Sequence, residues 1–442
     1  MGKEYLIQEK PLKALIVFAI PMIIGNLFQQ FYTMVDSVVV GRFVGEQALA
    51  AVGASYSLTT VFISVAIGGG VGASVITSQY FGAREYGKMK SSVRTALAAF
   101  AVLSMVLGMF GLLFSRQIMI WLNTPEEALS SAAEYLRIYF LGLPFLFMYN
   151  ILSSMFNALG KSKIPLCLLI FSSVFNMILD VILVKNAGMG VAGVAWATLI
   201  AQGISAACSA MLFLREMKQY EGRGTEGIFN KTEFFNMTGI ALPSILQQST
   251  VSIGMMLVQS VVNSFGAQML AGFSAGMRVE SICVVPMAAM GNVMSSYTAQ
   301  NIGAGRYDRV RAGYRTGYAI VFSFAAVLCL WLETCSGPLI RMFLGDKGSL
   351  GAFQTGTDYL RFIGWFFALI GLKMITDGLL RGAGDMKMFT IANLVNLGIR
   401  VVIAVTCAPR WGIAFVWMAV PVGWLANYLI SYREYRTGRW QL

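Results

Sequence analysis

Histidine is absent from this chain of 442 residues, and acidic and basic side chains together make up only 12% of it. Without histidine the chain lacks the usual proton shuttle, the commonest nitrogen ligand of metals and the usual partner of a catalytic serine or cysteine. A soluble globular protein carries about 25% charged residues. The two shortages together count against a soluble protein and against an enzyme built on imidazole chemistry.

Cysteine is also scarce, and the six cysteines form no CxxC motif, so they predict neither a disulfide framework nor a metal site. They are Cys167, Cys208, Cys283, Cys329, Cys335 and Cys407. Residues 82–88 match the GxxxxGK pattern of a phosphate-binding loop, but Met89 follows where serine or threonine is needed. The clustered DDxxD-type metal ligands that a membrane prenyltransferase needs are missing too. We therefore expect no enzyme and no cofactor.

Long apolar segments are what the chain does have. Hydrophobic residues make up 57% of it, and the mean hydropathy is +0.68. Twelve apolar segments approach or exceed the roughly 20 residues that span a bilayer as a helix. They cover residues 14–40, 49–77, 96–114, 138–156, 164–184, 191–214, 238–263, 271–299, 316–332, 362–380, 389–408 and 412–431. The sequence predicts an all-α polytopic membrane protein with twelve transmembrane helices in two homologous six-helix bundles.

The prediction of two bundles comes from an internal repeat, in which residues 243–316 echo residues 21–95. GEQALAAVGA, which begins at Gly45, returns as GAQMLAGFSA, which begins at Gly266. Further on, EYLR (134–137) returns as DYLR (358–361). A period this long is too large for a solenoid and indicates two homologous halves. Transporters with a central site between two bundles have this organisation.

The loops divide the chain and orient it. We expect an N-lobe with helices 1–6 (1–215), a polar cytoplasmic linker (216–232) and a C-lobe with helices 7–12 (233–442). Most of the 33 Lys and Arg residues fall in the tails and in the loops on the side of the tails. The positive-inside rule then places both termini in the cytoplasm, in a multi-pass protein of the cytoplasmic (inner) membrane. The basic residues are scattered among short loops, so we expect no nucleic-acid partner.

A few charges fall inside the predicted spans, where each costs at least about 2.5 kcal/mol and normally faces a cavity or a partner. In the first half, Asp36 lies in helix 1 and Asp180 in helix 5. Asn176 stands one turn before Asp180, so the two side chains share a helix face. When the halves are aligned on EYLR and DYLR, Arg400 stands where the first half has Asn176, and Ala404 where it has Asp180. The second half has therefore lost this acidic cluster.

The second half carries other charges in its spans. Lys373 and Asp377 are spaced i, i+4 and predict an internal ion pair more than a transport site. Glu280 is the candidate acid of the C-lobe. It can serve transport or form a local ion pair with Arg278 or Arg400, and both interpretations stay open.

Several motifs resemble one family over essentially the whole chain. The first helix has the pattern P-x14-D-x4-G with Pro21, Asp36 and Gly41, followed by GEQALAAVG and SQYFGAREY. FNMILD ends at Asp180, and GVAGVAWAT ends at Thr198. Together they resemble the multidrug and toxic compound extrusion (MATE) transporters and are most similar to the DinF-like bacterial and archaeal branch.

The resemblance implies secondary active multidrug efflux, in which amphipathic, often cationic compounds are exported in exchange for H⁺ or Na⁺ by alternating access. It implies a cation-coupling pocket in the N-lobe, with Na⁺ or H⁺ at Asp36, Asn176, Asp180 and Thr198. A tyrosine of helix 4 belongs to that pocket; Tyr135 is the better match, and Tyr139 one turn away is the alternative. The NorM-like branch has its acids on helices 7 and 10, and helix 7 here has none.

The substrate cavity is expected between the lobes, where methionine would suit ligands of varied shape. Its candidate residues are Gln30, Met34, Gln248, Met255, Met256, Met290 and Met294. The expected partners are small-molecule drugs or metabolites and the lipid bilayer, and the protein is expected to work as a monomer. The alternative function is a lipid-linked oligosaccharide flippase of the same superfamily, which would need a basic cavity for a pyrophosphate.

Overall fold

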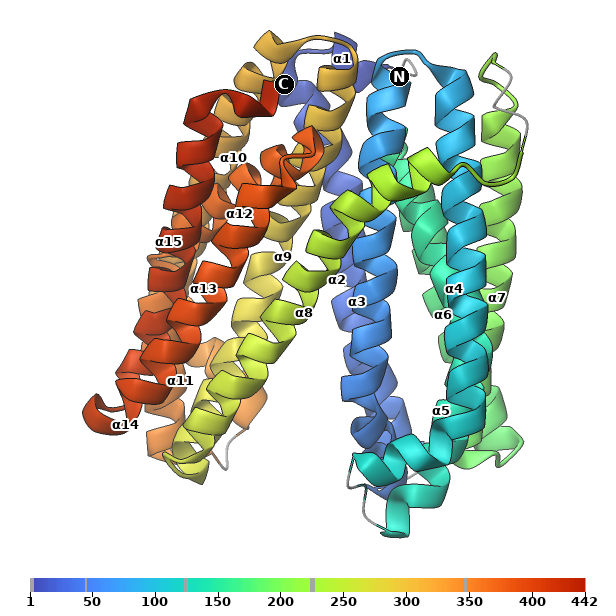
Figure 1. Cartoon of the computed structure of the whole chain (residues 1–442). Helices are drawn as coiled ribbons and strands as arrows, with labels where there is room; N and C mark the ends of the chain where they lie inside the picture. Colours follow the sequence, from blue (N-terminus) through green and yellow to red (C-terminus); the bar gives the residue numbers. More distant parts are fainter. Residues whose placement is uncertain are drawn as a thin grey trace. The chain divides into compact units, whose positions relative to one another are not determined.

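A computed structural model describes residues 4–43, 46–122, 124, 126–222, 227–345 and 348–441. The side chains of residues 34–43, 46–52, 54, 56–57, 127, 255–256 and 259 lie outside this description. Within it, every regular element is helical (Figure 1). The long helices are α2 (Pro11–Phe43), α3 (Glu46–Gly82), α4 (Tyr86–Trp121), α5 (Glu126–Ala158), α6 (Lys163–Asp180), α7 (Gly190–Met217), α8 (Lys231–Asn263), α9 (Ala267–Gly303), α10 (Tyr307–Leu344), α11 (Leu350–Gly364), α12 (Phe367–Ala383), α13 (Met386–Thr406) and α15 (Ala414–Thr437). The short ones are α1 (Tyr5–Gln8), the π-helix η1 (Val181–Asn186), α14 (Ala408–Trp411) and the 3-10 helix η2 (Arg439–Gln441).

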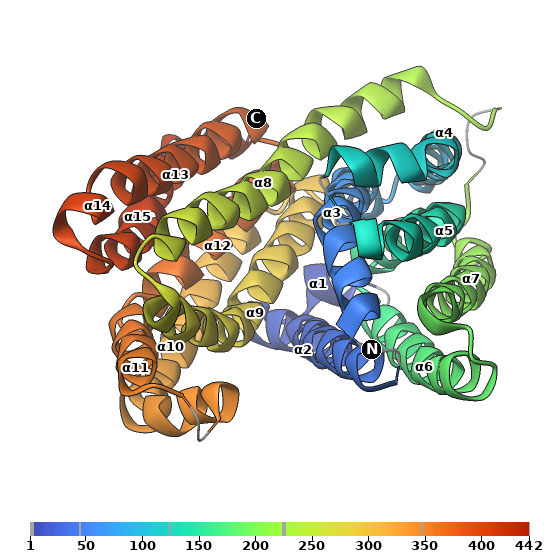
Figure 2. The same cartoon turned by 90° about the horizontal axis from the view of Figure 1, so that it is seen from below.

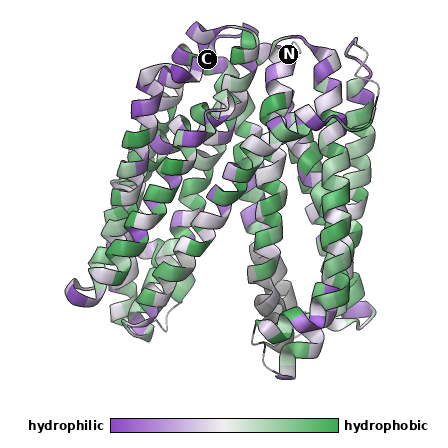
Figure 3. Cartoon of the chain, viewed as in Figure 1, coloured by the Kyte–Doolittle hydropathy of each residue, from purple (hydrophilic) through white to green (hydrophobic). Residues whose placement is uncertain are grey.

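The fold is that of an all-α polytopic membrane protein, as predicted. Among the described residues, ten helices are long and apolar enough to cross a membrane. The count reaches eleven when α11 and α12, which meet at a bend of 53°, form one span. The remaining predicted span lies in α8, a helix of 33 residues. Hydrophobic residues predominate along the middle of the helices, while polar residues gather toward their ends (Figure 3).

The sequence repeat returns as a repeat of helices. Helices α3 and α9 both have 37 residues, and they begin and end at equivalent positions of the repeat. Helices α4 and α10 also begin at equivalent positions, Tyr86 and Tyr307. The single helix α5 corresponds to the bent pair α11–α12. Equivalent segments of the repeat therefore form equivalent helices in the two halves.

The chain divides into two compact units. We call residues 24–245 the N-unit, and residues 1–23 with 246–442 the C-unit. The borders between these units lie within α2 and α8. The domain boundary that the sequence predicts lies in the linker 216–232, and that boundary remains a prediction. In the N-unit, α5 packs against α3, α4 and α7, and α6 packs against α7 (Figure 2).

Close packing of α3 against α8 in the N-unit depends on glycine. A Cβ atom on Gly68 would lie 2.6 Å from the backbone nitrogen of Ile245, and one on Gly72 would lie 2.6 Å from that of Ala241. Small residues let helix backbones approach each other in a membrane. The GGGVG run at 68–72 therefore serves close helix packing.

In the C-unit, α9 packs against α10, α11 and α12, and α13 packs against α15. Both chain ends pack on the connection between α9 and α10. At the N-terminal end, the backbone oxygen of Leu6 accepts a hydrogen bond from Asn301 (3.2 Å). At the C-terminal end, the rings of Tyr307 and Trp440 have centroids 6.3 Å apart. Both described ends of the chain therefore pack at the same end of α9 and α10.

Candidate cation-binding site

The first part of the candidate site lies at the end of α6 in the N-unit. Asn176 is 2% exposed and Asp180 is 1% exposed, and their i, i+4 spacing puts them on one helix face. Asp180 is the last residue of α6, and the π-helix η1 follows directly. π-Helical turns inside longer helices often occur at functional sites.

Asn176 joins three helices of the N-unit through its side chain. Tyr32 of α2 donates a hydrogen bond from its hydroxyl to Asn176 Oδ1. Asn176 Nδ2 in turn lies 3.4 Å from Thr198 Oγ1 on α7. Thr198 donates its own proton to the backbone oxygen of Val194 at 3.0 Å. The structure thus brings together Asn176 and Thr198, two of the residues predicted from the sequence.

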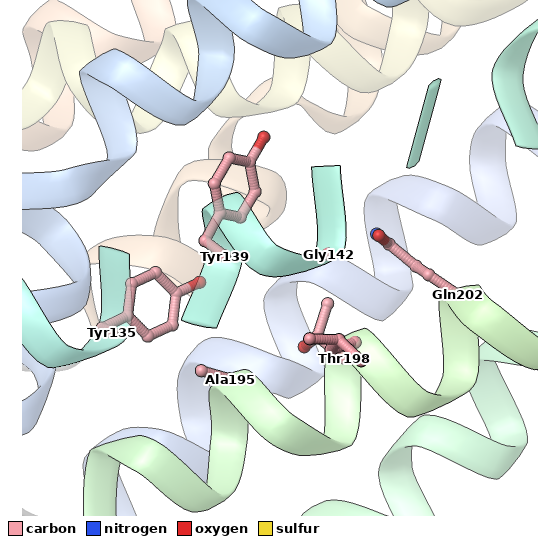
Figure 4. Close-up of a pocket in the computed structure, with 7 residues that line it drawn as sticks. Tyr135, Tyr139, Gly142, Ala195, Thr198 and Gln202 are labelled. Atoms are coloured by element: carbon pink, nitrogen blue, oxygen red, sulfur yellow. The ribbon is translucent and has the colours of Figure 1, made fainter. Parts of the chain in front are cut away.

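A small cavity of about 10 Å³ lies beside Thr198, between α5 and α7 (Figure 4). Tyr135 and Tyr139 of α5 line it from one side, and Thr198 and Gln202 of α7 from the other. This volume fits about one water-sized particle. Both tyrosines that the sequence left open therefore line the same cavity, although the hydroxyl of Tyr139 donates to the backbone oxygen of Thr59 at 3.3 Å.

Asp36 and Tyr135 complete the set of residues predicted for this site. Asp36 lies in α2, but its side chain is outside the described residues. Tyr135 also packs against Val184, Val191 and Val194, so its ring is anchored in an apolar cluster beside the end of α6. Asn176, Asp180 and Thr198 offer carboxylate, amide and hydroxyl oxygens, which are the ligand types that hard cations prefer.

Sequence reasoning missed two side chains here, Tyr32 and Gln202. Tyr32 stands four residues before Asp36 and so on the same face of α2. That spacing was a usable signal. Gln202 follows Thr198 by one turn of α7, which is the same kind of signal.

The C-unit charges form two further groups. The ion pair predicted between Lys373 and Asp377 is confirmed, with Nζ and Oδ2 3.1 Å apart and both side chains buried. Asn393 bonds to both members of the pair, and Ser431 donates to Asp377 Oδ1 at 2.8 Å. The charge of Asp377 is therefore compensated within the C-unit.

Glu280 belongs to the second group. The hydroxyl of Tyr359 donates to Glu280 Oε2 at 2.5 Å, and Arg400 interacts with Glu280 through its charge. Of the two candidate partners, Arg400 is the one whose charge acts on Glu280, while Arg278 is exposed on α9.

The residues predicted to line the substrate cavity differ in their surroundings. Gln30 and Gln248 are exposed, whereas Met290 (3% exposed) and Met294 (0%) are buried in the C-unit. The side chains of Met34, Met255 and Met256 lie outside the described residues. Among the described residues, no three Cys, Asp or Glu side chains come together as a metal site.

Comparison with known proteins decides the family. The MatE family model matches residues 21–182 and 243–406, one copy in each half of the chain. The chain belongs to the MatE family. The two matched copies follow the repeat that the sequence and the helices both show.

Relatives of this MatE protein are similar along almost its whole length. The probable multidrug resistance protein YpnP of Bacillus subtilis is 30% identical over 98% of this chain and 97% of its own. YoeA, another probable multidrug resistance protein of that organism, is 27% identical over 96% of this chain and 93% of its own. A transporter of the MOP superfamily from Pyrococcus furiosus has the same fold, with a TM-score of 0.91, 22% identity and coverage of 99% of this chain and 98% of that one.

Proposed function

We propose that this MatE protein exports amphipathic, often cationic drugs or metabolites from the cell in exchange for H⁺ or Na⁺, by alternating access. We place it in the cytoplasmic membrane as a monomer, with both termini in the cytoplasm. Support for multidrug export comes from the family and from relatives whose names describe multidrug resistance.

The observation that carries the proposal is the polar cluster around Asn176 and Asp180. Both side chains are almost fully buried in a helix that is long and apolar enough to span a membrane. A buried carboxylate is costly unless it is neutralised, and H⁺ or Na⁺ can neutralise it reversibly. Tyr32 and Thr198 hold Asn176 between α2 and α7, so a change of charge at this site acts on the packing of three helices.

The energetics fit an exchange of this kind. If one H⁺ enters while one monovalent cation leaves, no net charge crosses the membrane. The pH gradient alone then drives export, with about 1.4 kcal/mol per pH unit. Asp36, which the family resemblance implies as a further ligand, would make the acid part of the site a coupled pair with shared titration.

The flippase alternative would use the basic residues of the C-unit, and their contacts count against it. Lys373 forms an ion pair with Asp377, and the charge of Arg400 acts on Glu280. Arg381 donates to Asn292 Oδ1 at 2.7 Å and to Ser295 Oγ at 3.3 Å. A pyrophosphate would have to compete with these internal partners.

Dye transport in everted vesicles tests the proposal. Vesicles that contain the protein are energised separately by a pH gradient and by a Na⁺ gradient, and accumulation of a cationic dye is followed. We expect one of the two gradients to drive accumulation, and Asp180→Asn to abolish it at equal protein level. The matched control is Asp377→Asn, which changes an acid outside the site. Dye transport that neither gradient drives would refute cation exchange.

A further inference from the structure

The C-unit contains a counterpart of the candidate cation site. When the halves are aligned on EYLR and DYLR, the tyrosine of the site, Tyr135, corresponds to Tyr359 on α11. In the same alignment, Asn176 corresponds to Arg400 on α13. The two units thus share the tyrosine, but the amide of one unit is replaced by a guanidinium in the other.

These counterpart residues form a group in the C-unit together with Glu280 on α9. Tyr359 is 1% exposed and donates its hydroxyl proton to Glu280 Oε2. The charge of Arg400 acts on both Glu280 and Tyr359. Arg400 Nε is buried and makes no hydrogen bond among the described residues, and the carboxylate of Glu280 is the opposite charge that acts on this guanidinium.

The two units also differ at the position of Glu280, which supplies the carboxylate of this group. When the halves are aligned on Gly45 and Gly266, Glu280 corresponds to Thr59 on α3. The C-unit therefore has an acid where the N-unit has a hydroxyl, and it has the arginine that balances this acid.

Two glycines make room for this group. A Cβ atom on Gly423 of α15 would lie 2.9 Å from Arg400 Cγ. A Cβ atom on Gly276 of α9 would lie 2.7 Å from Tyr359 Cδ1. Any larger residue at either position would displace the side chain beside it. The C-unit is therefore shaped around the arginine stem and the tyrosine ring.

We propose that Arg400 is the resident cation of the C-unit and takes the place that an exchangeable cation has in the N-unit. An arginine side chain stays protonated in proteins, so it cannot leave or discharge during a transport cycle. The C-unit site therefore neither binds nor releases a coupling cation, and one molecule exchanges cations at a single site. This inference rests on the proposed function for its meaning in transport.

The proposal predicts a latent site. Arg400→Asn gives the C-unit the residue that the N-unit has at this position. Glu280, Tyr359 and the new amide would then offer oxygen ligands without an internal cation, which suits a monovalent cation such as Na⁺ or H⁺. Cys283 is a further titratable group that faces Glu280.

Cation binding to the purified protein tests the inference directly. Bound radioactive Na⁺ per molecule and protons taken up on a pH jump are measured for the unaltered protein, Arg400→Asn, and the double variant Arg400→Asn with Glu280→Gln. We expect Arg400→Asn to bind one cation more per molecule, as Na⁺ or as H⁺, and the double variant to lose this gain. No gain in a folded Arg400→Asn protein would overturn the proposal.

The single variant Glu280→Gln keeps the proposal testable if Arg400→Asn does not fold. We expect Glu280→Gln to bind as many cations per molecule as the unaltered protein. Loss of a bound cation in Glu280→Gln would overturn the proposal. Arg400→Lys is the matched control, because it keeps the positive charge and should add no site. If the unaltered protein binds no cation while Arg400→Asn binds one, the inference about Arg400 holds and the proposed coupling in the N-unit fails.

Discussion

Tyr32 donates a hydrogen bond to the side chain of Asn176, which ties α2 to α6 across a long stretch of sequence. Asn176 is the central member of the candidate cation site, since it also reaches Thr198. The orientation of its amide oxygen is therefore set by a residue that is not itself expected to bind the cation.

Replacement of Tyr32 by phenylalanine should weaken cation coupling without loss of the fold. The variant loses one hydrogen bond worth about 1 kcal/mol, which corresponds to about a fivefold loss of cation affinity. Dye efflux as a function of Na⁺ or H⁺ concentration measures this shift. Tyr428→Phe, which removes a hydroxyl bonded to Tyr318 in the C-unit, is the control and should leave the affinity unchanged.

Asp180→Asn and Asp377→Asn should have opposite effects on transport and on stability. Asp180 lies in the candidate site, so its variant should insert and fold but fail to transport. Asp377 compensates buried Lys373, and removal of one partner of a buried ion pair costs about 3–5 kcal/mol. Thermal unfolding in detergent and efflux at matched expression separate the two effects. A stable Asp377→Asn protein without transport, beside an active Asp180→Asn protein, would move the coupling site to the C-unit.

The pair of Lys373 and Asp377 should be replaceable by apolar residues. Buried ion pairs exchanged for hydrophobic residues of similar volume are often neutral or stabilising. We expect Lys373→Met together with Asp377→Leu to restore most of the stability that Asp377→Asn loses, although Asn393 and Ser431 lose a partner. Unfolding temperatures of the single and double variants measure the energetic coupling between positions 373 and 377. Additive losses in the double variant would show that the pair does not act as a unit.

Asp385 should make the C-unit more stable at low pH. Burial, followed by the neighbouring charge of Glu434, raises the pKa of the Asp385 carboxyl above its usual value. The folded protein therefore binds this proton more tightly than the unfolded chain, so the stability it contributes is present at low pH and is lost as the pH rises through the folded pKa. Unfolding temperature followed from low to neutral pH should fall less steeply in Asp385→Asn than in the unaltered protein.

The N-unit offers a matched comparison for Asp385. Its equivalent in the repeat is Lys161, which lies in a loop of the same backbone geometry, with Nζ 2.5 Å from Glu216 Oε2. Asp385→Lys should therefore stabilise the C-unit at neutral pH, where it would place a cation beside Glu434. A drop of the unfolding temperature in this variant would contradict a favourable interaction between Glu434 and a cation at this position.

The orientation in the membrane can be tested at Lys218 and Arg436. Both lie on the side that the positive-inside rule places in the cytoplasm. Single cysteines at these positions, in a background without the six native cysteines, should resist an impermeant thiol reagent added to intact cells and react after lysis. Labelling of either position from outside would reverse the predicted topology.

The sequence by itself determined the helices, their repeat and the contacts within one helix. Twelve apolar segments predicted the spans, because a helix that crosses a bilayer needs an unbroken run of such residues. The ion pair of Lys373 with Asp377 and the shared face of Asn176 and Asp180 followed from the i, i+4 spacing alone. The correspondence of Asn176 with Arg400 followed from the repeat.

Only the tertiary structure decided which side chains of different helices meet. No spacing in the sequence shows the hydrogen bond from Tyr32 to Asn176 or the one from Tyr359 to Glu280. Nor does it show that the charge of Arg400, and not that of Arg278, acts on Glu280. Helix periodicity fixes the direction of a side chain relative to its own axis, but the rotation and depth of each helix against its neighbours come from packing. At Gly276 and Gly423 that packing leaves the space in which Tyr359 and Arg400 lie.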